Sequence, residues 1–200
     1  MNGAPRIIRS HGGHPPLLMS LVHVLHPLMF RTIYLNQSDN EEAFPMSQDP
    51  IMMSIQAAIS TLQRGDREAA RREFETIWAS IADQPSPFHE CVLSHFIADT
   101  QDDIVEELAW DRRALEAAMR CTDAEAKEHH GSLSIAGFLP SLHLNLGDDY
   151  LRLGDVTSCE IHLVAGAGAC NDLAESPYGN MIRGGLERLA ERLKLATKSV

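Results

Sequence analysis

Apolar residues recur every three or four positions along most of the chain after residue 50, which is the spacing of one helix face. The clearest stripe lies in the segment 142–163 and begins with Leu142, Leu146, Tyr150 and Leu153. Gly154 and Asp155 interrupt it, since glycine can take the left-handed conformation that ends a helix and aspartate can cap the next one. The stripe resumes with Val156, Cys159 and Leu163. This pattern predicts two antiparallel helices joined by a tight turn.

Similar start and stop signals divide the remaining chain into further helices. Three pairs place a capping residue before a proline that can occupy the first helical turn: Asp49-Pro50, Ser86-Pro87 and Ser176-Pro177. Turns are expected at Gly65-Asp66 and Asp102-Asp103. Thr122 and Glu125 form a capping box that predicts a helix from Asp123 to about Ala136, and Pro140 must then start a new helix.

These helices carry apolar stripes that predict their buried faces. The expected inward residues are Ile51, Ile55, Ala58, Ile59 and Leu62, then Ala70, Phe74, Ile77 and Ile81, then Ile104, Leu108, Leu115 and Met119, and finally Ile182, Leu186, Leu189 and Leu193. Aromatic residues make up only 6% of the chain, which favours helices over sheets. The predicted fold class is therefore all-α, with about seven to nine helices.

The order of residues in the central hairpin resembles the tetratricopeptide repeat. The resemblance rests on Leu146-Gly147, Tyr150, Gly154-Asp155, Cys159 and Leu163. Small Gly147 and Cys159 would let the two helices approach closely. His143 departs from the family pattern where an aromatic residue is usual, as does Gly166 in place of alanine, and no proline closes the repeat. An ordinary helical hairpin with a Gly-Asp turn is the alternative.

The turn pairs beginning at Gly65, Asp102 and Gly154 are 37 and 52 residues apart. The first spacing is close to the family period of about 34 residues, and the second leaves room for one extra helix. The resemblance implies a right-handed solenoid of antiparallel hairpins, in which first helices line a concave surface that holds a peptide. Parts of the chain also resemble a bacterial group of such repeat proteins to which no activity is assigned.

The net charge of −11 argues against nucleic-acid binding, because phosphate contacts need a clustered basic face. An acidic surface suits a soluble cytoplasmic protein or a basic partner. The cysteines form no CxxC pair, so we expect reduced and mostly buried thiols at Cys91, Cys121, Cys159 and Cys170.

Residues 1–45 differ from the repeat-like domain expected over residues 46–200. Their three basic and three acidic residues cancel, so the excess of acid lies in the second part. The apolar run from Leu17 to Phe30 is too short and too interrupted to span a bilayer, and no A-x-A signal cleavage site follows it. Two interpretations stay open: an extra helix that packs on the first repeat, or sequence translated ahead of a natural start at Met46, Met52 or Met53.

The strongest candidate for chemistry is the set Cys91, His95 and Asp99, which are four residues apart and share one helix face. Zinc could use these ligands, with His129 or His143 as a further one. One helix face supplies a third ligand only with distortion, however, and no H-E-x-x-H motif, nucleophile elbow or phosphate loop is present. We therefore expect no metal, no cofactor and no catalytic residue.

If the resemblance holds, the concave groove would be lined by three successive first helices. Its residues would be His89, Val92, Phe96 and Asp99 on one helix, and Ser141, Leu144, Asn145, Asp148 and Arg152 on the other, with Met52, Ile55, Ile59 and Gln63 on the preceding first helix. Arg152 is essentially the only cation there, so a carboxylate clamp is not expected. The partner would be an apolar or basic protein segment. The alternative for this surface is that the chain's own extra helices cover it.

The sequence thus predicts a non-catalytic helical scaffold that binds a protein or peptide. A small metal-binding protein or metalloenzyme that uses the Cys/His/Asp face is the alternative from another class. A third interpretation is a structural subunit of a larger complex that docks through the segment from Leu17 to Phe30. The partner's identity and the oligomeric state are left open.

Overall fold

The computed structural model describes residues 49–83, 85–129 and 134–198. All regular structure in this part of the chain is helical, in agreement with the predicted all-α class. The α-helices are α2 (Pro50–Gln63), α3 (Arg67–Ile81), α4 (Pro87–Ala98), α5 (Ile104–Arg120), α6 (Asp123–His129), α7 (Leu139–Arg152), α8 (Val156–Ala169) and α9 (Pro177–Lys198). Two 3₁₀ turns, η1 (Ile135–Gly137) and η2 (Cys170–Asp172), precede α7 and follow α8. The interpretations of residues 1–45 lie outside the described residues.

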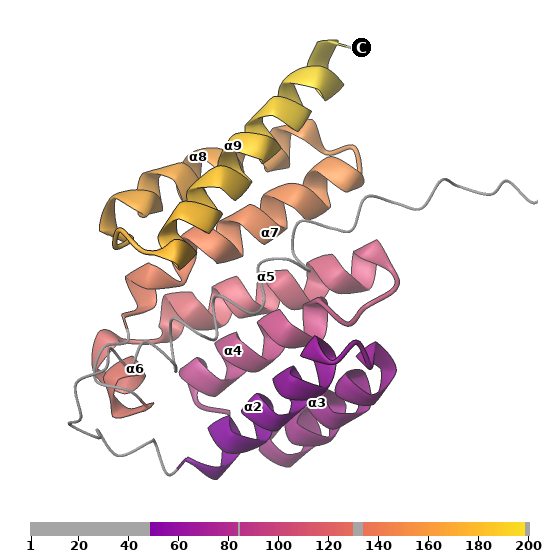
Figure 1. The fold of residues 1–200 in the computed structure, drawn as a ribbon, viewed down its shortest axis with the longest axis vertical. Helices are drawn as coiled ribbons and strands as arrows, with labels where there is room; N and C mark the ends of the chain where they lie inside the picture. The colour runs from indigo at the N-terminus through magenta and orange to yellow at the C-terminus, as the bar shows by residue number, and fades with distance from the viewer. Residues whose placement is uncertain (1–48, 84, 130–133, 199–200) are drawn as a thin grey trace, which may run out of the picture.

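The helices stack in chain order along the longest axis of the molecule, from α2 and α3 at one end to α8 and α9 at the other (Figure 1). Consecutive helices pair as the hairpins α2–α3, α4–α5 and α7–α8, and α9 packs against both α7 and α8. The α5 helix contacts α7, so it joins the second hairpin to the third. Short α6 and η1 occupy the connection between these two hairpins.

The predicted turns and caps agree with the structure. Gly65 and Gly154 have φ angles of 88° and 81°, the left-handed region that favours glycine at a helix end. Asp66 and Asp155 then accept hydrogen bonds from backbone amides in the first turns of α3 and α8. The capping box at Thr122 is present, because the Glu125 carboxylate accepts from the Thr122 amide at 2.7 Å and the Thr122 hydroxyl accepts from the Glu125 amide at 3.2 Å.

The helix that begins at Asp123 is shorter than predicted. Its described part ends at His129, and the chain resumes at residue 134 before the 3₁₀ turn η1. Glycines in this stretch and Pro140, which cannot continue a helix, explain why a helix does not reach Ala136. The predicted new helix, α7, starts at Leu139 with proline in its first turn.

Most predicted stripes form the core. On α3 and α9 the buried residues include all those expected, from Ala70 to Ile81 and from Ile182 to Leu193. On α2 three of the five expected positions are buried, whereas Ile51 and Leu62, at the two ends of the stripe, are only partly buried.

The prediction for α5 is wrong in part, since Met119 is 72% exposed and the fully buried positions are Glu107, Asp111, Ala114, Ala117 and Ala118. The reason is that α5 lies between α4 and α7, where alanines allow close packing on both sides.

All four cysteines are free, and three are buried, as expected. No helix in the described ranges is long and apolar enough to cross a membrane.

Candidate functional site

Nine of the predicted groove residues lie on α4, its C-cap and α7, and none of them is fully exposed. Of the four predicted on α2, Gln63 is exposed and the other three are buried. Eight of the nine are less than 9% exposed, and only the Arg152 side chain keeps partial exposure, at 33%. Phe96 stacks on Phe74 with ring centroids 5.9 Å apart, and the Ser141 hydroxyl donates to the Phe138 carbonyl at 2.8 Å. The α4–α7 surface is therefore closed in this structure.

His89 is also part of this buried layer. Its Nε2 atom lies 2.5 Å from a carboxylate oxygen of Asp49, the residue that caps α2. This contact ties the start of α2 to the first turn of α4. Burial raises the pKa of Asp49, but the hydrogen bond and the charge of His89 outweigh it, and the pKa is lowered overall.

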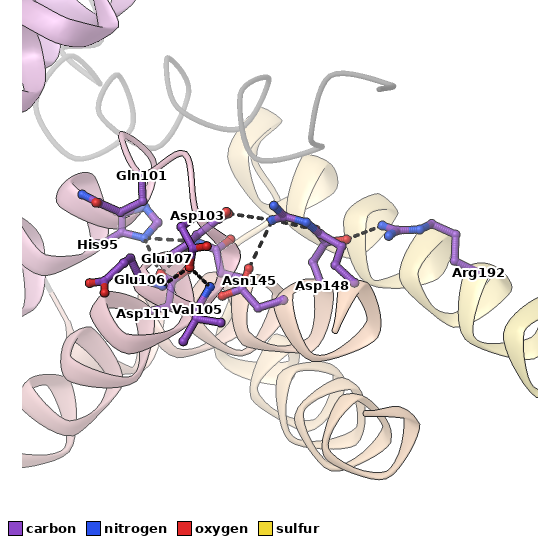
Figure 2. Close-up of polar contacts among 12 residues, drawn as sticks. His95, Gln101, Asp103, Val105, Glu106, Glu107, Asp111, Asn145, Asp148 and Arg192 are labelled. Carbon is purple, nitrogen blue, oxygen red and sulfur yellow. Dashed lines mark hydrogen bonds and ion pairs between the residues drawn. The ribbon is translucent and has the colours of Figure 1, made fainter. Parts of the chain in front are cut away.

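A cluster of buried polar side chains lies between α4, α5 and α7. The Asn145 amide nitrogen is 3.2 Å from His95 Nδ1 and 3.3 Å from the Asp111 carboxylate, and His95 Nδ1 is 3.8 Å from that carboxylate. Figure 2 shows these three side chains pointing toward one another from three helices. The structure thus brings His95 and Asn145 together, although they are fifty residues apart in sequence.

The cluster continues along α5 and α7 as a group of four carboxylates, Glu107, Asp111, Asp148 and Asp149, here called the carboxylate cluster. Arg152 lies 2.8 Å from Glu107, 3.4 Å from Asp149 and 3.9 Å from Asp148. Arg192 from α9 donates to Asp148 (Figure 2). Two guanidinium groups therefore face four acidic side chains.

The imbalance between negative and positive charge is greatest at Asp149. One of its carboxylate oxygens is buried without a hydrogen-bond partner. Burial, and then the charges of Asp111 and Glu107, raise the pKa of Asp149 to about 11, despite the opposing charge of Arg152. A proton on Asp149 removes the repulsion between the two acidic groups, because a neutral Asp149 carboxyl can donate a hydrogen bond to Asp111, whereas two ionised carboxylates only repel each other. The raised pKa favours the neutral form of Asp149.

Asp99, at the end of α4, belongs to the same region. Its pKa is raised well above the usual range by burial and by the charges of Asp111 and Glu107, with Arg67 acting in the opposite direction. Burial lowers the pKa of Arg152, but its hydrogen bond to Glu107 and the surrounding carboxylates raise it overall. The carboxylates around Arg152 therefore stabilise its positive charge.

The alternative of a metal site at Cys91, His95 and Asp99 is not supported by the residues that the structure describes. No group of three or more His, Cys, Asp or Glu side chains there is placed to hold an ion. Burial, with smaller effects from Cys121 and Glu90, raises the pKa of Cys91 to about 12, so this thiol is a poor source of the thiolate that zinc binds. The side chain of His129 and all of His130 lie outside the described part.

Sequence reasoning missed Glu107, Asp111, Asp149 and Arg192 as members of the site. A signal was present: Glu107, Asp111, Ala114 and Ala118 lie at helical spacing, and the small residues mark the face that packs most closely. The leucines of α5 form a competing stripe, and its greater hydrophobicity directed the prediction to the wrong face.

Comparisons with known proteins identify no relative of this chain. No known family profile matches this sequence, and no similar curated protein or solved structure was found.

Proposed function

We propose that this chain is a non-catalytic helical scaffold of the tetratricopeptide type that binds a protein or peptide segment at the α4–α7 surface. The favoured partner is basic or apolar, and the carboxylate cluster supplies the negative charge that attracts it. The sequential hairpins α2–α3, α4–α5 and α7–α8 support this proposal, because a stack of hairpins closed by α9 is the organisation of a repeat scaffold.

The observation that carries the proposal is the carboxylate cluster itself. A joint between α5 and α7 built only for stability would be apolar, since buried ionisable groups are costly unless each is paired. Here the four acidic side chains Glu107, Asp111, Asp148 and Asp149 meet two arginines. Buried groups with strongly shifted pKa values concentrate at functional sites. The cluster also includes Asp148 and contacts Asn145, two of the residues expected to line the groove.

Access to the cluster runs past Arg152 and Arg192. Their side chains are 33% and 43% exposed, whereas the side chains of the carboxylate cluster are at most 10% exposed. Because the remaining groove residues are buried, a partner binds only after the surface opens. The apparent affinity is then the intrinsic affinity reduced by the fraction of open molecules.

The test uses the full chain as bait for a random peptide library displayed on phage. Enriched peptides are synthesised, and their binding to the wild type is compared with binding to a variant carrying Glu107→Gln and Asp148→Asn. These substitutions keep the side-chain shapes and remove two charges. Glu68→Gln, on the exposed surface of α3, is the matched control.

We expect basic peptides to be enriched, to lose at least tenfold in affinity to the double variant, and to bind the Glu68→Gln variant normally. Circular dichroism establishes that all three proteins are folded. A library that yields no binding peptide, or peptides whose affinity the double variant leaves unchanged, would contradict the proposal.

A further inference from the structure

A second polar contact lies on the opposite side of α7, at its seam with α8. The Nδ1 atoms of His143 and His162 are 3.0 Å apart, and their ring centroids are 5.2 Å apart with the planes inclined by 40°. One ring donates its Nδ1 proton and the other accepts, so at least one imidazole is neutral there. Both side chains are half-buried, at the edge of the seam rather than in its centre.

Two glycines bring these rings together. An ideal Cβ at Gly166 would lie 3.1 Å from the His143 Cβ, which is a tight contact, whereas one at Gly147 would be crowded by Leu189 at 2.7 Å and in ordinary contact with the His162 Cβ at 3.7 Å. Without those methyl groups α7 and α8 can approach closely enough for the imidazoles to touch. Tyr150 stacks on the His162 ring at 5.4 Å with an interplanar angle of 18°, which restricts the orientation of that ring.

We propose that His143 and His162 form a two-imidazole binding site for a late first-row divalent metal ion of the Cu²⁺, Ni²⁺ or Zn²⁺ class, ligated through both Nδ1 atoms. Metal–nitrogen bonds of about 2.0–2.1 Å place two ligands of one ion about 2.9 Å apart at a right angle and about 3.3 Å apart in a tetrahedron. The observed separation of 3.0 Å falls within that interval. When the metal binds, the proton shared between the two Nδ1 atoms moves to Nε2 of the donating ring, so both imidazoles ligate as neutral Nε2–H tautomers after a small rotation of the rings.

The chemistry of the seam suits such an ion. Imidazole is a preferred ligand of copper, nickel and zinc. Burial lowers the pKa of both histidines, and the charge of His162 lowers that of His143 further, so the neutral, ligating forms dominate at neutral pH. Because the rings are only half-buried, water can complete the coordination shell. A site with two protein ligands holds its ion exchangeably, and protonation weakens binding as the pH falls.

The experiment titrates the full chain with Cu²⁺, the ion of this series that imidazole binds most tightly. The chain has ten histidines, so the pattern of losses is the informative quantity. We compare the wild type with His143→Gln, His162→Gln and the double variant by isothermal titration calorimetry at pH 7.5. If the two imidazoles share one ion, each single substitution and the double substitution remove the same single equivalent of bound Cu²⁺.

Electron paramagnetic resonance of the wild type supplies a measurement that does not depend on the variants folding. Hyperfine coupling to two imidazole nitrogens at one equivalent of Cu²⁺ is expected, and its loss in His162→Gln supports the assignment. Single substitutions that leave the stoichiometry unchanged, losses that add to two equivalents in the double variant, or a wild-type spectrum without two-nitrogen coupling would each overturn it. None of these readouts involves the α4–α7 surface.

Discussion

Replacing Asp149 with asparagine tests whether the carboxylate cluster holds a proton. In the unfolded chain the carboxyl has its usual pKa of 3.8, whereas in the fold its pKa is raised to about 11. Between these values the native state binds one more proton than the unfolded state. The free energy of unfolding therefore falls as the pH rises, by up to about 1.4 kcal/mol per pH unit from this group.

The Asp149→Asn variant lacks this loss, because asparagine is neutral in both states and its amide can donate to Asp111. Relative to the wild type, the free energy of unfolding of the variant should rise by up to about 4 kcal/mol between pH 4 and pH 7. The substitution therefore stabilises the fold at high pH and has no such effect near pH 4. Urea unfolding followed by circular dichroism at pH 5, 6, 7 and 8 measures the difference.

Asp83→Asn, at an exposed position just beyond α3, controls for the loss of one carboxylate. If the unfolding free energies of wild type and Asp149→Asn run parallel across this range, Asp149 is ionised in the fold. The shared-proton description of the cluster is then incorrect.

Three further predictions concern packing and are checked by equilibrium unfolding. Gly147→Ala should destabilise the fold by about 1–3 kcal/mol, because its Cβ would lie 2.7 Å from a methyl group of Leu189. In the control Gly168→Ala, in the same hairpin, the added Cβ meets nothing within 4 Å, so this substitution should be neutral or stabilising. Equal effects of the two substitutions would contradict the close approach at Gly147. Gly154→Ala should cost about 1–2 kcal/mol, because its φ of 81° disfavours a side chain; an unchanged midpoint would refute this. Phe74→Ala, which leaves a cavity at a fully buried position, should lower the free energy of unfolding by about 3–5 kcal/mol. A loss below 1 kcal/mol would show that neighbouring side chains fill the cavity.

The turns and the core stripes could be predicted because their causes are local. A positive φ at Gly154 and a cap at Asp155 follow from the two residues themselves, and the α9 stripe from Ile182 to Leu193 follows from helical spacing. Each signal needs only a few neighbouring residues. Such features therefore depend little on how the rest of the chain packs.

The site was harder to predict because it depends on which face of α5 meets α7. Both a leucine stripe and an alanine stripe occur on that helix, and only the packed structure shows that Glu107 and Asp111 share the buried one. The resemblance to groove residues placed Asn145 and Arg152 on α7 correctly but did not reveal that Asn145 is buried. Burial of a polar residue is a tertiary property that composition does not report.

Both polar contacts proposed to have a function are on α7, and this shared helix decides how their tests are interpreted. His143 and Tyr150 face α8, while Asn145 and Asp149 face α5, so α7 could transmit a shift from one seam to the other. A local effect of His162→Gln would leave the pH dependence of unfolding set by Asp149 intact. If that substitution also removes the pH dependence, α7 has moved as a body, and its effect on metal binding no longer identifies a ligand. Measuring both quantities on each variant therefore separates a lost ligand from a displaced helix.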